Sequence, residues 1–168
     1  MSARMFIKFE EPGITGEATA SDHSDEIEVL SWSHSFNQPT SATRSSAGGG
    51  TVEQANHSDF TFVKYLDAST DDLLKMCWSG KQIGKATFCA YRANGDNTPV
   101  KYLEVAMDKV VVSNLSFGGG GGGGDLPTEN ISLSYGKVQY SYVTQKKDDG
   151  TGDGVQPVSH DLITQQVA

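Results

Sequence analysis

The chain has 168 residues, of which 36% are hydrophobic and 20% are charged, so we expect one domain over residues 1–168 with a real hydrophobic core. Its formal charge of -8 has the wrong sign for neutralising phosphates, and no apolar run reaches the length of a bilayer span, so we expect neither nucleic-acid binding nor membrane insertion. No export signal is visible at the start, so we expect folding in the cytoplasm, where Cys77 and Cys89 would be free thiols.

Alternating apolar residues in the first half of the chain predict three strands. The second strand changes its apolar register between Val29 and Leu30, which predicts a bulge or sharp twist, because strand side chains alternate with period two. The third strand has apolar residues on both faces, Phe60 on one and Val63 on the other, which predicts a strand covered on both sides. The three predicted ranges are 4–10, 25–36 and 51–66.

A helical period follows at about residues 70–79. Ser69 suits the N-cap, Asp71 and Asp72 are carboxylates of the first turn, and Gly80 suits the C-cap. Apolar residues recur at helical spacing, namely Leu73, Leu74, Met76, Cys77 and Trp78. The sequence therefore predicts one amphipathic helix.

Three further strands are predicted in the second half of the chain, at 86–92, 100–117 and 129–143. The last of them changes register at Gly136, which predicts a glycine bulge. Repeated bulges curl a sheet, so the predicted fold is mainly β, an antiparallel β-barrel with one flanking α-helix. An open sandwich is the alternative.

Three serines share one face of the strand at 25–36: Ser31, Ser33 and Ser35. This face is small, polar and uncharged. The segment 38–50 that follows has few apolar residues and ends in three glycines, so we expect a long protruding loop. Loops of this length in compact domains are usually functional, and the polar residues that it offers for a contact are Gln38, Thr40, Ser41, Thr43, Arg44 and Ser45.

No motif in the chain predicts a catalytic residue, a metal site or a cofactor. The seven glycines at 118–124 precede Asp125 instead of the lysine and hydroxyl of a phosphate-binding loop, so we interpret them as a connector between strands. Triplets of His, Ser and Asp at 23–25, 57–59 and 159–161 are adjacent in sequence, whereas hydrolase triads assemble from distant positions. The histidines and cysteines lack zinc-site spacing.

A family resemblance rests on short segments in a fixed order along nearly the whole chain. They are MFIK at 5–8, IEVLSWS at 27–33, FVKYLDAST at 62–70, SGK at 79–81, YLE at 102–104, VVVS at 110–113 and PTENISL at 127–133. In order and spacing they resemble the haemolysin-coregulated protein (Hcp) family of type VI secretion tubes. The glycine run and the tail at 158–162, which lacks a tryptophan, depart from the family pattern.

The resemblance implies a structural subunit and not an enzyme. Such a subunit forms a hexameric ring, the rings stack head-to-tail into a tube, and the tube carries effectors and works with spike and sheath proteins. The subunit itself leaves the cell through the apparatus, which is consistent with the absence of an export signal. On this interpretation Ser31, Ser33 and Ser35 line the pore and the loop at 38–50 contacts the next ring. A monomeric β-barrel that binds a small ligand is the alternative.

Overall fold

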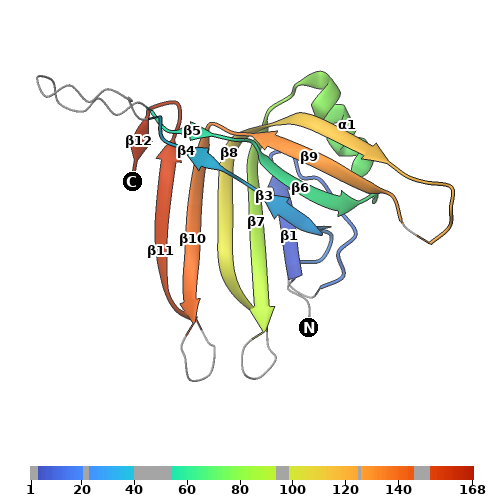
Figure 1. Cartoon of the computed structure of the whole chain (residues 1–168), viewed down its shortest axis with the longest axis horizontal. Helices are drawn as coiled ribbons and strands as arrows, with labels where there is room; N and C mark the ends of the chain where they lie inside the picture. Colours follow the sequence, from blue (N-terminus) through green and yellow to red (C-terminus); the bar gives the residue numbers. More distant parts are fainter. Residues whose placement is uncertain (1–3, 21–22, 40–53, 94–98, 125, 146–151) are drawn as a thin grey trace, which may run out of the picture.

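The computed structural model describes residues 4–20, 23–39, 54–93, 99–124, 126–145 and 152–168, and within these ranges the chain forms antiparallel strands and one helix (Figure 1). The mainly β fold with one helix that the sequence predicts is confirmed. In chain order the elements are β1 (Arg4–Glu10), β2 (Ile27–Glu28), β3 (Ser31–Ser33), β4 (Phe36–Asn37), β5 (Asn56–His57), β6 (Phe60–Tyr65), α1 (Thr70–Ser79), β7 (Ile83–Ala93), β8 (Pro99–Gly118), β9 (Thr128–Ser134), β10 (Lys137–Gln145), β11 (Gly152–Asp161) and β12 (Gln166–Val167).

Two sheets share the long strand β8. Sheet A has the order β12-β11-β10-β8-β7-β1-β2, and sheet B runs from β3 through β6 and β9 to the second part of β8. Val110 of β8 still pairs with β7, whereas Val111 already pairs with β9. The residue before this change, Lys109, has a positive φ of 56°, so the strand bends where it passes from one sheet to the other.

The segment from β2 to β3 joins the two sheets on the opposite side. The backbone N–H of Val29 donates to Met5 O of β1 at 2.9 Å, and the next N–H, of Leu30, donates to Val63 O of β6 at 2.7 Å. Backbone pairing therefore runs around a barrel through β8, β7, β1, β2–β3, β6 and β9. The irregularity predicted at this point is a crossing between sheets and not a bulge within one.

The core lies between the sheets and contains side chains from both. Phe60 and Phe62 of β6 are fully buried, and Trp32 stacks on Phe60 at a ring-centroid distance of 5.7 Å. Each such side chain contributes about 1.5–3 kcal/mol through burial. The other face of β6 is open, because Val63 is half-buried and Tyr65 is 45% exposed. The prediction that this strand is covered on both sides is wrong.

Gly136 marks a second crossing between sheets. Its N–H donates to Asp108 O at 3.0 Å and its carbonyl accepts from Leu162 N–H at 2.8 Å, so the chain leaves β9 of sheet B and enters β10 of sheet A. A Cβ at this position would lie 3.0 Å from Ile163 Cδ1 and 3.3 Å from Lys109 Cβ. The predicted glycine bulge is thus a turn between sheets, and close packing favours glycine there.

Sheet A continues past the barrel as β10, β11 and β12, which we call the wing (Figure 1). The sequence analysis did not predict β11 or β12, and the divergent tail that it noted falls in and just after β11. The side of the wing that continues the core-facing side of sheet A carries exposed apolar residues, including Val158 and Val167. An apolar sheet face therefore remains open in the isolated chain.

The helix α1 has the predicted bounds and packs against β8. Leu73 and Met76 are buried, but Trp78, which shares the predicted apolar stripe, is 80% exposed. Gly80 adopts the left-handed conformation at the C-cap, with a φ of 64°. Ser69 is the N-cap residue, yet its hydroxyl donates to the Asp67 carboxylate and makes no cap hydrogen bond.

Candidate functional site

The outer face of sheet B carries mostly small side chains, with the larger Tyr65 at the end of β6. The register brings Ser31 and Ser33 of β3 opposite Val63 and Thr61 of β6, and the ladder continues in the same way across β9 to β8. Paired residues share a face, so these positions form one surface. We call it the polar face, and it consists of Ser31, Ser33, Thr61, Val63, Asn114, Ser116, Asn130 and Ser132.

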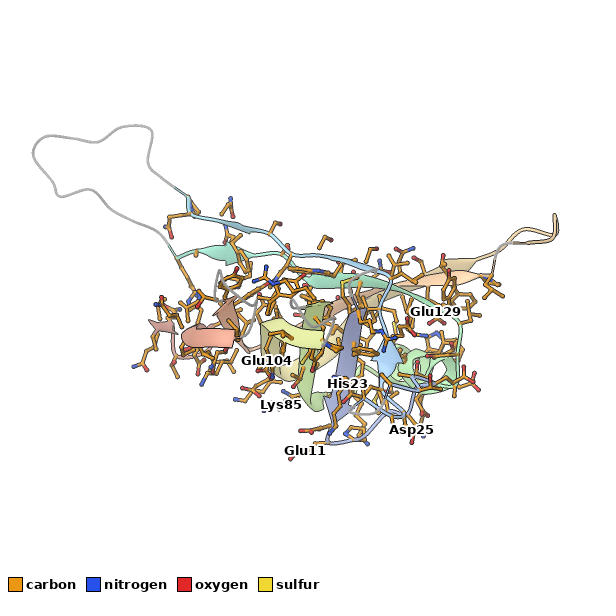
Figure 2. The ribbon with its side chains drawn as sticks, turned by 90° about the horizontal axis from the view of Figure 1, so that it is seen from below. Glu11, His23, Asp25, Lys85, Glu104 and Glu129 are labelled. Atoms are coloured by element: carbon orange, nitrogen blue, oxygen red, sulfur yellow. The ribbon has the colours of Figure 1, made fainter. Side chains whose placement is uncertain are left out.

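None of these eight positions is charged, whereas the outer face of sheet A carries many charges. Lys85 and Asp108 are paired across β7 and β8 on that side, and Asp108 also faces Lys137 of β10. Figure 2 shows Lys85 and Glu104 on the side of the molecule away from sheet B. The barrel therefore presents one neutral, hydrophilic face and one charged face.

Ser35 lies just beyond the polar face, between β3 and β4. Its backbone N–H donates to Ser58 Oγ at 2.9 Å, and with Ser33 and Thr61 it lines a shallow hollow of about 360 Å³. Asp59 also lines this hollow and accepts a hydrogen bond from Ser113 Oγ at 2.5 Å. The three serines predicted to share a face thus lie near one another, and a carboxylate borders them.

Strands β4 and β5 form a separate two-stranded ribbon that leads into the predicted loop. Phe36 pairs with His57, and Asn37 pairs with Asn56. Gln38 follows β4 and is exposed. The other predicted loop residues lie outside the described part of the chain, namely Thr40, Ser41, Thr43, Arg44 and Ser45. The ribbon is therefore the described base of the predicted stacking loop.

A chain of histidines and tyrosines holds this ribbon against the wing. His34 Nδ1 lies 2.5 Å from Tyr140 Oη of β10, and His34 Nε2 lies 2.7 Å from Tyr135 Oη. Tyr135 Oη is also 2.7 Å from His57 Nδ1 of β5, and His57 Nε2 is 2.8 Å from His160 Nδ1 of β11. We call these five side chains the histidine–tyrosine network.

The directions of these hydrogen bonds follow from one acceptor. His34 Nε2 lies 3.1 Å from the carbonyl oxygen of Ser58, which can only accept, so His34 carries its hydrogen on Nε2. With neutral histidines, Tyr140 then donates to His34 Nδ1, and the arrangement that gives the Tyr135 hydroxyl an acceptor has Tyr135 donating to His57 Nδ1 and His57 Nε2–H donating to His160 Nδ1. All three histidines are neutral in this arrangement.

The surroundings of the network favour the neutral forms. Burial lowers the pKa of His34 to about 4, with the nearby His57 acting in the same direction and the Ser58 hydrogen bond opposing it. Burial and the neighbouring His160 also lower the pKa of His57. Burial raises the pKa of Tyr135 and Tyr140 well above the ordinary range, so their hydroxyls stay protonated donors.

A buried ion cluster fixes the turn between β6 and α1. Lys64 and Glu129 are fully buried, and Lys64 Nζ lies 2.6 Å from Glu129 Oε2 and 3.0 Å from Asp67 Oδ1. Asp67 Oδ1 also accepts the backbone N–H of Ser69 at 2.9 Å. One lysine thus neutralises carboxylates from β9 and from the start of the helix, so the cluster joins sheet B to α1.

The remaining groups give little basis for covalent or metal chemistry. Within the described ranges, no three His, Cys, Asp or Glu side chains are grouped so as to hold a metal ion. Cys77 and Cys89 are free thiols as predicted, and burial raises the pKa of Cys89 to about 11, which makes it a poor nucleophile. His23 stacks on Phe6 and contacts Glu26 Oε2 at 2.5 Å. Its triplet is part of a packed loop and does not form a triad.

Comparison with known proteins shows the family. Residues 6–142 match the family described as "Type VI secretion system effector, Hcp". The chain is also 40% identical over 154 residues to protein hcp1 of Pseudomonas aeruginosa, across 92% of this chain and 91% of that protein. The chain belongs to the Hcp family. Hcp proteins are structural tube proteins of type VI secretion and not enzymes, they form tube-like assemblies, and they are secreted components of that system.

Solved structures show the same fold. Hcp1 from Salmonella typhimurium superposes with a TM-score of 0.76 at 27% identity, and the alignment covers 100% of both chains. A structure described as a type six secretion system protein superposes with a TM-score of 0.88 at 24% identity, over 99% of this chain and 100% of that one. None of the described helices of the present Hcp chain is long and apolar enough to cross a membrane.

The sequence analysis did not predict the histidine–tyrosine network or the buried ion cluster. The triplets at 57–59 and 159–161 contain His57 and His160, but each triplet was assessed for catalysis within itself, whereas the contact joins one triplet to the other. Lys64 and Glu129 belong to the segments that carried the family resemblance. An isolated lysine within an apolar strand was the available signal for a buried ion pair.

Proposed function

We propose that this Hcp chain forms hexameric rings that stack head-to-tail into the inner tube of a type VI secretion apparatus, with the polar face toward the pore. The observation that carries the pore assignment is the contrast between the neutral face of sheet B and the charged face of sheet A. A channel that passes diverse cargo needs a hydrated wall without strong charge or a large apolar area, because both would retain cargo. Ser31, Ser33 and Ser35 are the proposed pore-lining serines.

The open side of the wing supports a ring contact. An apolar groove of about 490 Å³ runs there between Phe36 of the ribbon and Val138, Val158 and Val167 of the wing. Apolar surface of this kind is stabilised when another molecule covers it. A ring needs two unlike patches on each subunit, and the wing is the proposed first patch, with the second on the opposite side of the barrel.

We assign the contact between rings to the loop that the ribbon carries, as the sequence predicts for Gln38, Thr40, Ser41, Thr43, Arg44 and Ser45. The two-stranded ribbon pairs outside both main sheets, which supports a projecting position for the loop. We also propose that residues 1–168 act as one barrel unit, that spike, sheath and effector proteins are its partners, and that it leaves the cytoplasm through the apparatus.

Native mass spectrometry of the purified chain tests this proposal. A protomer of 18.0 kDa predicts a ring of 6 × 18.0 = 108 kDa, with larger multiples where rings stack. A species of 18.0 kDa alone, at every concentration and ionic strength tried, would contradict the ring and favour the monomeric ligand-binding barrel. In that case the apolar groove of the wing would be the first place to look for the ligand.

A further inference from the structure

The histidine–tyrosine network joins the β4–β5 ribbon and the segment before it to the wing, a connection that no backbone hydrogen bond makes within the described residues. His34 follows β3, His57 lies on β5 of the ribbon, and His160 lies on β11 of the wing. The main-chain pairs of β4 are with β5, in a sheet of their own. The side-chain contacts of the network therefore fasten the ribbon to the wing, and what changes the network changes that attachment.

The network is fully satisfied only when all three histidines are neutral. Each ring then has one N–H donor and one bare nitrogen, and every contact in the series from Tyr140 to His160 joins a donor to an acceptor. Both nitrogens of a protonated histidine are donors, so each added proton removes one acceptor from the series. The hydrogen bonding of the network therefore changes when acid protonates its histidines.

The cost of a proton depends on where it binds. On His160 it places Nδ1–H against the N–H of His57 Nε2 at 2.8 Å, so two donors face each other. Reversing the whole series relieves that contact, but it leaves His34 Nε2 bare against the Ser58 carbonyl at 3.1 Å, so two acceptors face each other. If only His57 changes its tautomer, each contact keeps a donor and an acceptor, but the Tyr135 hydroxyl hydrogen loses its acceptor in the network.

A proton on either of the other two rings costs a tyrosine its acceptor. On His57 it leaves the Tyr135 hydroxyl hydrogen without an acceptor in the network, and on His34 it does the same to Tyr140. His34 also carries the charge in a half-buried site, with Phe60 edge-on to its ring at a centroid distance of 5.5 Å. A single proton therefore costs the network one tyrosine hydrogen bond, whereas protons on both His57 and His160 place two charged donors against each other at 2.8 Å and break the contact between ribbon and wing.

We propose that the histidine–tyrosine network is an acid-sensitive latch, and that protonation of its histidines releases the β4–β5 ribbon from the wing. The latch stands on the hydrogen-bond geometry. Its consequence for assembly rests on the proposed function: if the ribbon carries the contact between rings, acid separates stacked rings before it unfolds the barrel.

Titratable groups from several elements surround the network. They are Tyr135 from the crossing after β9, Tyr140 from β10, His57 and His160 as each other's neighbours, and the carboxylate of Asp59 from the segment before β6. Asp59 favours the charged form of His34, but burial outweighs it and the pKa of His34 is about 4. The depressed pKa of His57 has the same sign, so the latch opens as the pH falls below the ordinary histidine value of 6.5 toward 4.

Hydrogen exchange measured by mass spectrometry tests the latch directly, on the whole chain and without requiring rings. After correction for the intrinsic pH dependence of exchange, we expect protection of peptides covering β4 and β5 to fall on the order of tenfold between pH 7 and pH 5. Peptides covering β7, in the barrel wall, should keep their protection. Equal protection of the ribbon at both pH values would overturn the proposal.

Two variants separate the network from general acid effects. In His34→Gln/His57→Gln the two network histidines whose pKa burial lowers are absent, so ribbon protection should change less than threefold across the same pH range. His23→Gln, which alters the histidine outside the network, should respond to pH like the parent chain. A double variant with the full parental response would also overturn the latch.

Light scattering on the same samples distinguishes a failure of the latch from a failure of the proposed function. If rings form and stack but the ribbon never opens in acid, the latch is wrong and the tube assignment stands. If the ribbon opens in acid while the chain stays monomeric throughout, the latch is supported and the ring proposal is wrong.

Discussion

Lys64 holds together the junction between sheet B and α1. Its ammonium lies within 3.0 Å of carboxylates from two elements, Glu129 of β9 and Asp67 before α1, and both Lys64 and Glu129 are fully buried. A buried ion pair adds little net stability over an apolar pair, because desolvation offsets the attraction. Removing one member is different, because it leaves a charge buried without its partner.

Replacing Lys64 by methionine should therefore destabilise the chain strongly. We expect Lys64→Met to lower the free energy of unfolding by about 3–5 kcal/mol, measured by urea denaturation at fixed protein concentration. Lys64→Met/Glu129→Leu should recover part of that loss, because it removes both charges. Lys75→Ala, at an exposed position of α1, serves as the control and should change stability by less than about 0.5 kcal/mol. A single variant as stable as this control would contradict the account of the cluster.

His34 predicts how stability depends on pH. Its pKa is about 4 in the folded chain and 6.5 in the unfolded chain, so between these values the unfolded chain binds more protons. Stability from this group is complete above pH 6.5 and is lost as the pH falls toward 4. The ring is only half-buried, so we expect a loss of about 1–2 kcal/mol, less than the full shift would give.

Urea denaturation at pH 7 and pH 5 measures this loss. His34→Gln should show a smaller difference between the two pH values than the parent chain does, although it is less stable at both. Backbone hydrogen bonds from Thr164 and Ile163 lower the pKa of Asp161 from its ordinary value of 3.8. Asp161 therefore stays charged between pH 7 and pH 5 and does not contribute to the difference. The pH effect on His34 would be refuted by parallel losses in the parent and the variant.

At the scale of elements, the bent strands explain both the success and the limits of sequence interpretation. The changes of apolar register at Val29–Leu30 and at Gly136 were visible in the sequence, and both mark real breaks. A bulge within a sheet and a crossing between sheets produce the same local pattern. The choice between them depends on which distant strand supplies the next acceptor, such as Val63 O for Leu30, and alternation does not contain that information.

The wing illustrates the second limit. β11 holds Gly154 and Pro157 and lacks clear apolar alternation, yet it pairs with nine residues of β10. Backbone pairing with an existing strand holds it in place, and Pro157 is tolerated because β12 pairs only with His160 and Asp161, further along β11. The polar face was partly predictable, because Ser31 and Ser33 alternate visibly. Its extension across three more strands depends on register.

Gly16 lies between β1 and β2, in a segment for which the sequence analysis predicted no strand or helix. Its N–H donates to Asp25 O at 2.7 Å, and an added Cβ would lie 2.5 Å from Glu26 O and 2.8 Å from Glu26 C. These backbone atoms cannot move aside easily, so Gly16→Ala should lower the free energy of unfolding by about 1–3 kcal/mol. Gly120→Ala has open space around the new methyl group and should be neutral. Equal melting temperatures for the two variants would contradict this close approach.

At the scale of the whole molecule, charge should control how rings associate. Six chains of -8 give 6 × -8 = -48 per ring, so bare rings repel along the axis at low ionic strength. Salt screens this repulsion over a Debye length of about 10 Å at 0.1 M. We therefore expect light scattering to report longer particles as the salt concentration rises. Particles that shorten, or that keep one length, would count against head-to-tail stacking.

The most direct test of the central claim is the accessibility of the polar face in the assembled ring. Ser33→Cys places a thiol on that face, and Lys85→Cys places one on the charged face of sheet A. N-ethylmaleimide should label both added thiols above the parental background, whereas a maleimide carrying a long polyethylene glycol chain should label Lys85→Cys far faster than Ser33→Cys. If the long reagent labels both positions at equal rates in assembled tubes, the polar face does not line the pore.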